Sequence, residues 1–212
     1  MDPRFRGDDI DRGAGMTADL MGSKICSLML LDEKKQELVI KATQSLSERY
    51  RTKPPIKVGE SVVGRVVQQK IPITVRDVVR ESGYKYPEIA KMEGLRSLVS
   101  VPMMIKDRVI GVLNCYTTTE HEFGEEEIQL LVGVANQAAV AIENTDLLAE
   151  KIVAVEALET RKRVERAKGI LMKRHSLTEA EAYRMLQKQS MDKRHSLKEV
   201  AEAIIVSEEI AN

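Results

Sequence analysis

The C-terminal part of the chain is almost free of residues that break helices. Pro102 is the last of six prolines, and beyond Gly124 the only glycines are Gly133 and Gly169. Proline removes a backbone donor and glycine weakens a helix, so a long stretch with so few of them predicts helix almost throughout. The segment VERAKGILMKR, residues 164–174, lies inside this stretch.

Charge is unevenly distributed along the chain. The whole sequence of 212 residues has 33 basic and 33 acidic residues, which gives a formal net charge of zero. Residues 161–198 contain twelve Lys or Arg and four Asp or Glu, so the remainder carries an excess of eight acidic residues. This asymmetry favours an anionic partner for the basic segment, nucleic acid before a membrane surface. The alternative is a solvated helical face.

The N-terminus and the cysteines bear on the compartment. Residues 1–15 are rich in Asp, Arg and Gly, which predicts a disordered leader, and Met16 is an alternative start. No hydrophobic region of the signal-peptide type is present, and no apolar run has the length needed to span a bilayer. Cys26 and Cys115 are too few for a disulfide scaffold. We therefore expect a cytoplasmic protein with no membrane contact.

The first half of the chain reads as five strands with short helices between them. Residues 60–69 predict a short helix with valines on one side, and residues 84–97 a covering loop with a helical turn. The strands are predicted at residues 25–31, 37–43, 71–75, 98–105 and 108–116, with the third at an edge because it begins at a proline. Strands followed only by helices indicate an α+β fold with an all-α tail.

Three phrases of this half resemble the GAF domain family. They are VGESVVGRVVQQKIPI, SLVSVPMMIKDRVIGVLNCY and FGEEEIQLLVGVANQAAVAIEN, and the resemblance covers residues 16–146. It implies a five-stranded antiparallel sheet in the order 2-1-5-4-3, with flanking helices and a pocket on one face that senses a small molecule or a redox signal. The sequence identifies no cofactor and leaves the ligand unknown. The family's first helix is reduced here to residues 17–21.

The exit helix begins after Gly124 with three glutamates, which suit the positive end of a helix dipole. Apolar and small residues then recur at a spacing of three and four: Ile128, Leu131, Ala135, Ala138, Ile142, Thr145, Ala149 and Ile152. This seam predicts a parallel homodimeric coiled coil through residues 125–160, with residues 147–157 as the linker helix. The alternative is a seam buried against the chain's own sheet.

A near repeat follows, KRHSLTE at residues 173–179 and KRHSLKE at residues 193–199. Each ends in Ser-x-x-Glu, the capping box, which predicts helices that begin at Ser176 and Ser196. We expect the first helix to bury Ala180, Tyr183 and Leu186, and the second Leu197, Val200, Ala201, Ile204 and Ile205. Together with Val164, Ala167 and Leu171 these residues predict a core shared by three helical segments.

Residues 158–212 resemble the ANTAR family. The resemblance is carried by Arg161 and by AKGILMKR, EAYRMLQKQS and SLKEVAEAII. It implies a three-helix domain that binds RNA, as paired stem-loops in leader transcripts, and promotes transcription antitermination. Many members of the family have Asn at the position of Arg194.

The candidate RNA-binding residues are basic or polar, or expose backbone. Lys and Arg attract phosphates, guanidinium planes stack on unstacked bases, and Gln and Ser can bond to base edges. A glycine inside a helix permits close approach. The candidates are Arg161, Lys168, Gly169, Lys173, Arg174, Arg184, Lys188, Gln189, Ser190, Lys193 and Arg194. The alternative for each basic residue is a solvated charge.

The sequence offers little for catalysis or metal binding. GESVVG, residues 59–64, has one residue too many for a nucleophile elbow, and no P-loop or metal-ligand spacing occurs. The GAF strand order would place Cys26 beside Cys115 as a redox pair, although two buried thiols are the alternative. The leading prediction is an RNA-binding antitermination regulator that is no enzyme. A DNA-binding regulator and a thiol-dependent reductase are the alternatives.

Overall fold

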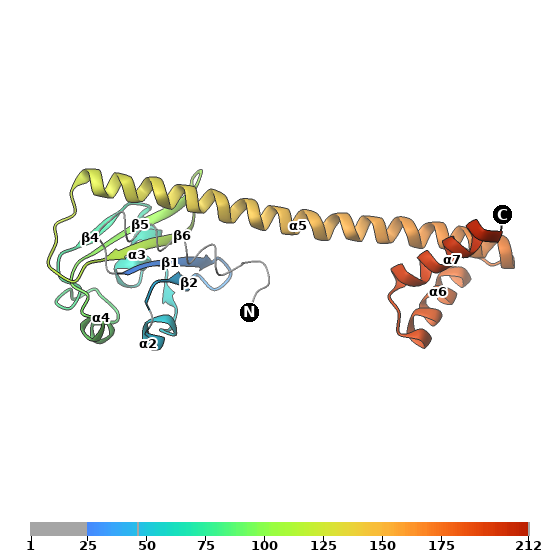
Figure 1. The fold of residues 1–212 in the computed structure, drawn as a ribbon, viewed down its shortest axis with the longest axis horizontal. Helices are drawn as coiled ribbons and strands as arrows, with labels where there is room; N and C mark the ends of the chain where they lie inside the picture. The colour runs from blue at the N-terminus through green and yellow to red at the C-terminus, as the bar shows by residue number, and fades with distance from the viewer. Residues whose placement is uncertain (1–24, 46, 212) are drawn as a thin grey trace. The chain divides into compact units, whose positions relative to one another are not determined.

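The computed structural model describes residues 25–45 and 47–211, so the predicted leader and the short helix at residues 17–21 lie outside it. The chain divides into two units, Met1–Thr145 and Asp146–Asn212. Helix α5 (Glu125–His175) contributes to both. Figure 1 shows the order of the elements along the chain.

The first unit is built on a six-stranded antiparallel sheet in the order β3-β2-β1-β6-β5-β4. The strands are β1 (Ile25–Asp32), β2 (Glu37–Thr43), β3 (Ile56–Lys57), β4 (Ile73–Val75), β5 (Leu98–Ile105) and β6 (Arg108–Tyr116). The expected order of the five predicted strands is confirmed, but the count of five is wrong. The additional strand, β3, has only two residues, too few for an alternating pattern, and pairs Ile56 with Leu38 of β2.

The two faces of the sheet are covered by different helices (Figure 1). Successive side chains of a strand point to opposite faces, so Cys26 and Leu28 of β1 pack with Leu131 and Ala135 of α5. On the other face lie three short helices, α2 (Glu48–Arg51), α3 (Ser61–Gln69) and α4 (Pro87–Glu93), in two further buried clusters. The sheet is therefore buried on both faces.

Helix α3 confirms the short helix predicted at residues 60–69. Its four valines are buried. Gly64 lies so close to the backbone of β3 that a residue with a Cβ would not fit there. A Cβ at Gly64 would lie 2.2 Å from the carbonyl oxygen of Lys57. Residues 84–97 hold α4, so the covering segment contains a defined helix.

The first half of α5 is buried against the sheet. Leu131, Ala135 and Ile142 belong to the same buried cluster as strands β1, β5 and β6, and Ile128 packs against that cluster. The prediction that these residues form a coiled-coil seam is therefore wrong. The alternative, that they are buried against the chain's own sheet, is confirmed. Both arrangements require the same periodicity, which is why the sequence did not separate them.

The second unit has a core of its own, formed by the end of α5, α6 (Glu179–Lys193) and α7 (Leu197–Ala211). The predicted box at Ser196 is confirmed, since the Ser196 amide and hydroxyl donate to Glu199 and the Glu199 amide donates to Ser196. The predicted start at Ser176 is wrong, because the box before α6 is formed by Thr178 and Glu181. The core consists of Val164, Ala167, Leu171, Ala182, Leu186, Val200, Ala201 and Ile205.

Candidate nucleic-acid interface

Three basic side chains of α5 are paired with carboxylates of α7. Arg163 lies 3.7 Å from Glu202, Arg166 donates to Glu209 over 2.8 Å, and Arg174 donates to Glu208. These pairs tie α7 to α5 across the second unit. The basic character that the sequence gives to this side of α5 is therefore largely neutralised.

Lys168 also has carboxylate partners. Its Nζ donates to Glu179 of α6 over 2.7 Å and to Glu165 of α5 over 2.9 Å, and only 7% of the residue is exposed. The hydrogen bonds and charges of Glu179 and Glu165 raise the pKa of Lys168, and Lys168 lowers the pKa of Glu179. Lys168 thus joins α5 to α6 and does not present a free charge.

The remaining predicted cations are exposed. They form no ion pair within 4 Å among residues 25–45 and 47–211, although Arg184 has a longer electrostatic interaction with Glu181. Arg184 and Lys188 lie one turn apart on α6, so they share a face. The set consists of Arg161, Lys173, Arg184, Lys188, Lys193 and Arg194. These six residues, called the free cations below, are the part of the predicted site that can attract phosphates.

The turn after α6 is held by its own hydrogen bonds. The Ser190 hydroxyl donates to the carbonyl of His195 over 2.6 Å, so Ser190 stabilises the turn, and Gln189 beside it is half-buried. Arg194 ends α6 in the left-handed conformation, with φ of 54°. Asn adopts this conformation more readily than other residues with a side chain.

Gly169 occupies an open position on α5. A Cβ built there meets no atom within 4 Å, so no neighbouring helix of the described part requires a glycine. Glycine inside a helix costs about 1 kcal/mol relative to alanine. Close approach of a neighbouring helix is therefore not its role within this chain, and a contact with RNA stays a prediction.

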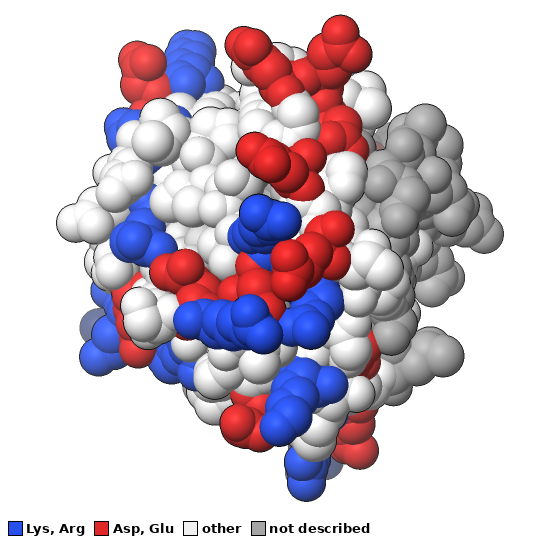
Figure 2. All heavy atoms as spheres, turned by 90° about the vertical axis from the view of Figure 1, so that its left-hand side faces the viewer, with Lys and Arg blue, Asp and Glu red and all other residues white. Residues whose placement is uncertain are grey.

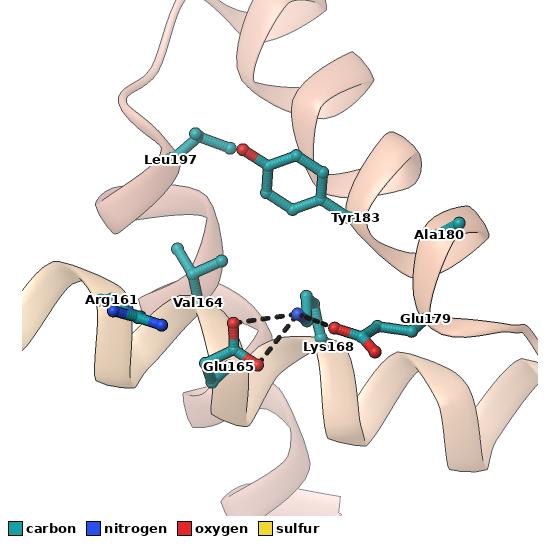
Figure 3. A pocket seen from close by; sticks show the side chains of 8 residues that line it. All are labelled: Arg161, Val164, Glu165, Lys168, Glu179, Ala180, Tyr183 and Leu197. Carbon is teal, nitrogen blue, oxygen red and sulfur yellow. Dashed lines mark hydrogen bonds and ion pairs between the residues drawn. The ribbon is translucent and has the colours of Figure 1, made fainter.

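An open groove of about 670 Å³ lies between α5 and α6. Tyr183, predicted to be buried, is 38% exposed and lines this groove, while Ala182 and Leu186 point into the core. Ala180, also predicted to be buried, is exposed at the groove. Figure 3 shows the residues that line it: Arg161, Val164, Glu165, Lys168, Glu179, Ala180, Tyr183 and Leu197.

Tyr183 is the residue of this surface that the sequence-based prediction wrongly assigned to the core. An aromatic residue is usually assigned to the core. The spacing of Ala182, Met185 and Leu186 marks a different side of α6 as the apolar one, and these are the residues that pack in the core of the second unit. That spacing is the signal that would have placed Tyr183 outside.

In the first unit, a buried polar row lies beneath α2, α3 and α4. Ser100 donates to Asn114 over 2.7 Å, and Ser27 and Tyr50 share a hydrogen bond of 3.0 Å. The hydroxyls of Tyr84 and Tyr116 lie 3.1 Å apart, and burial raises the pKa of Tyr84 to about 12. Among the described residues every buried side-chain nitrogen or oxygen has a partner. This row lies on the face of the sheet that α2, α3 and α4 cover.

Cys26 and Cys115 lie on the opposite face of the sheet. They are directly paired in the register of β1 and β6, their Cα atoms are 4.4 Å apart, and they form a disulfide. Both are fully buried and belong to the cluster that contains Ala135 and Ala139 of α5. The strand order thus brings the predicted pair together, with no exposed thiol to act on a substrate.

Charges of both signs lie on the surface of the first unit. Figure 2 looks onto a face of the first unit, where Lys and Arg side chains are mixed with Asp and Glu.

Of the helices in the described residues, none has the length and hydropathy to cross a membrane. No group of three metal-ligating side chains is found in the same part of the chain.

Comparison with known families agrees with these two units. The GAF domain family matches residues 15–143 and the ANTAR domain family matches residues 154–205. The chain belongs to the GAF domain family, with an ANTAR domain after the GAF domain. Both are regulatory domains.

Individual proteins resemble parts of the chain. The transcriptional regulatory protein PdtaR of Mycobacterium tuberculosis is 46% identical over 63 residues, which are 30% of this chain and 31% of that protein. This chain therefore spans about a third of that relative's length. The phosphoenolpyruvate-dependent phosphotransferase system protein of Escherichia coli is 26% identical over 129 residues, 61% of this chain and 17% of that protein.

Solved structures share the fold of the first unit. The GAF domain of a phosphoenolpyruvate-protein phosphotransferase from Coxiella burnetii has a TM-score of 0.62 at 24% identity, over 68% of this chain and 86% of that one. A free methionine-R-sulfoxide reductase from Neisseria meningitidis has a TM-score of 0.58 at 21% identity, over 69% and 83%. At these identities the likeness concerns the fold alone.

Proposed function

We propose that the protein is a signal-responsive regulator that binds hairpin RNA through its ANTAR domain and promotes transcription antitermination. The observation that carries the proposal is the set of free cations in a domain where Lys162, Arg163, Arg166, Lys168 and Arg174 are paired with carboxylates. Free cations attract phosphates without having to break an ion pair first. The similarity of 63 residues of the chain to a transcriptional regulatory protein supports the same direction.

The proposed complex contains two copies of the chain. Six large apolar residues of α5 within the second unit are more than half exposed: Leu147, Leu148, Ile152, Val153, Val155 and Leu158. Leu148 and Val155 are seven residues apart, two helical turns, so they share one face. A parallel coiled coil would bury this face and hold two RNA-binding surfaces at a fixed separation, which suits paired stem-loops.

The proposed signal acts on the GAF domain. A small ligand would exchange hydrogen bonds with the buried polar row that includes Ser27, Ser100 and Asn114. The redox state of Cys26 and Cys115 is a second candidate input, because this pair shares a buried cluster with α5. Either input would act on the helix that continues into the ANTAR domain.

The test compares hairpin RNA with duplex DNA on the full-length protein at matched salt. The probe is a hairpin selected on this protein from a library with random loops, and binding is followed by fluorescence anisotropy. We expect tighter binding of the RNA, and the double variant Arg184→Gln/Lys188→Gln should lower the slope of log affinity against log salt by about 2. Equal or tighter binding of duplex DNA would support the DNA-binding alternative instead.

The matched control neutralises two exposed lysines in the first unit. Lys34 and Lys35 lie in the turn between β1 and β2 and remove the same charge when both are changed to Gln. This variant should bind the hairpin as the wild type does. If both double variants lose affinity equally, only the net charge matters and the proposed surface is wrong.

A further inference from the structure

The groove between α5 and α6 is lined by apolar and aromatic side chains as well as charged ones, and Arg161 is the one free cation among its lining residues. Its apolar lining comes from Val164, which is 8% exposed, and from the half-buried Leu197, and the ring of Tyr183 points toward Leu197 (Figure 3). Arg161 lies at the α5 side of the groove. An aromatic ring next to apolar side chains can bind a flat, uncharged group.

The charges that line the groove cancel. Lys168 and Arg161 are positive and Glu165 and Glu179 are negative, and Lys168 is fully engaged by the two carboxylates. A groove with balanced charge does not concentrate phosphates. Arg161 is its one cation without an ion pair among the described residues, so a single anionic group can be held beside the flat one.

We propose that this groove binds one unstacked base of an RNA hairpin loop, with the base stacked on Tyr183 and a neighbouring phosphate on Arg161. The proposal rests on the proposed function and identifies where one nucleotide is held. A base has a flat apolar face and its nucleotide carries one negative phosphate, which matches this composition. Ala180 of the groove and Arg184 of the free cations are one turn apart on α6, so the groove adjoins the surface proposed for the phosphate backbone.

Lys168 gains a defined role in this arrangement. By binding Glu165 of α5 and Glu179 of α6 it fixes the distance between the two helices that form the groove. It is a positioning residue and does not touch the base.

The experiment places 2-aminopurine at each loop position of the selected hairpin and measures its fluorescence with full-length protein. For the wild type we expect a change at one loop position that differs from all others. Tyr183→Ala should abolish that change and weaken binding by about 10-fold to 100-fold, the range found when a stacking aromatic is removed. Tyr183→Phe keeps the ring and should keep both the signal and the affinity.

The control for lost apolar surface is Met191→Ala, on the same helix but outside the groove and 72% exposed. It should leave affinity and fluorescence unchanged. Circular dichroism and thermal unfolding check that the Tyr183 variants fold, which is expected for an exposed residue.

The outcomes separate this proposal from the function on which it rests. If the wild type does not bind hairpin RNA, the proposed function fails and the base site with it. If the wild type binds and Arg184→Gln/Lys188→Gln weakens binding, but Tyr183→Ala binds with wild-type affinity, the base site alone is overturned. The base site is also overturned if Tyr183→Phe is as weak as Tyr183→Ala.

Discussion

At the scale of single residues, neighbours decide which basic side chains can bind RNA. Lys168 and Arg184 have the same formal charge, yet Lys168 is bound by two carboxylates and Arg184 is exposed without an ion pair in the described chain. Moving Lys168 to phosphate would leave Glu165 and Glu179 close together without their cation. The free cations are therefore the better candidates for phosphate contacts.

Gly169 gives a prediction in which stability and binding change in opposite directions. Gly169→Ala should raise the stability of the second unit by about 1 kcal/mol, because alanine is the better helix former and its Cβ meets open space. If RNA approaches the backbone there, the same methyl group should weaken hairpin binding. Denaturant unfolding and anisotropy measure the two effects.

A second glycine of the same helix provides the control. Gly133 also has no atom within 4 Å of a built Cβ, but it lies in the first unit. Gly133→Ala should stabilise the protein by a similar amount and leave RNA binding unchanged. Wild-type binding by Gly169→Ala would remove Gly169 from the interface.

At the scale of elements, hydrogen bonds at their ends stabilise α6 and α7. The Thr178 hydroxyl and amide lower the pKa of Glu181, and the amide and hydroxyl of Ser196 lower the pKa of Glu199. Both carboxylates bond better when ionised. A carboxylate whose pKa is lower in the folded state stabilises the fold at pH values above its ordinary pKa of 4.5. This stabilisation is lost as the pH falls through the pKa of the folded state.

We therefore predict that α6 and α7 lose helix at acid pH, beginning as the pH falls below about 4.5. Far-UV circular dichroism against pH measures the loss. The double variant Glu181→Gln/Glu199→Gln keeps acceptors that can complete both capping boxes but removes the titrating groups. Its helix content should depend less on pH, and an unchanged acid transition would mean that other groups control it.

The disulfide between β1 and β6 gives a second prediction at this scale. It closes a loop with a sequence separation of 89, for which the chain-entropy treatment gives about 4.6 kcal/mol. Reduction should therefore lower the denaturant midpoint of the first unit. Because both sulfurs are fully buried, reduction of the native protein should be slow until the structure opens locally.

Intact mass and unfolding with and without a small dithiol test the pair. Cys26→Ala/Cys115→Ala should have one midpoint under both conditions. A wild-type midpoint unaffected by the dithiol, together with a mass that includes both thiol hydrogens before its addition, would mean that the pair is two ordinary buried thiols.

At the scale of the whole molecule, the two ends of α5 have different partners. In the first unit its apolar side is buried on the sheet, whereas residues such as Leu148 and Val155 in the second unit are exposed. An exposed apolar row on a helix is typical of a surface that binds another helix. The proposed occupant is a second copy of the chain.

Sedimentation equilibrium on two point variants tests the dimer. Leu148→Asp puts a charge in the proposed seam and should shift the protein to monomer. Val153→Asp introduces the same charge five positions further along, on the other side of α5 at a residue 67% exposed, and should leave the dimer intact. A monomeric wild type, or equal effects of the two variants, would contradict the proposed seam.

Most helices and strands of this protein could be predicted from local sequence patterns. The strands, the long helix, the capping box at Ser196 and the GAF and ANTAR resemblances are local patterns of spacing and residue type, and the predicted strand order is also confirmed. Strand β3 was missed because two residues carry no pattern.

The surroundings of each side chain, in contrast, could not be predicted from local patterns and depend on how distant parts of the chain pack. The tertiary structure placed Leu131 and Ala135 on the sheet, brought Lys168 between two carboxylates, left Tyr183 in an open groove and set Cys26 against Cys115. Periodicity defines that a helix has an apolar side, but the group that covers this side comes from another part of the chain. The partner of each charge depends on the same long-range packing, and so does the difference between a free cation and a buried one.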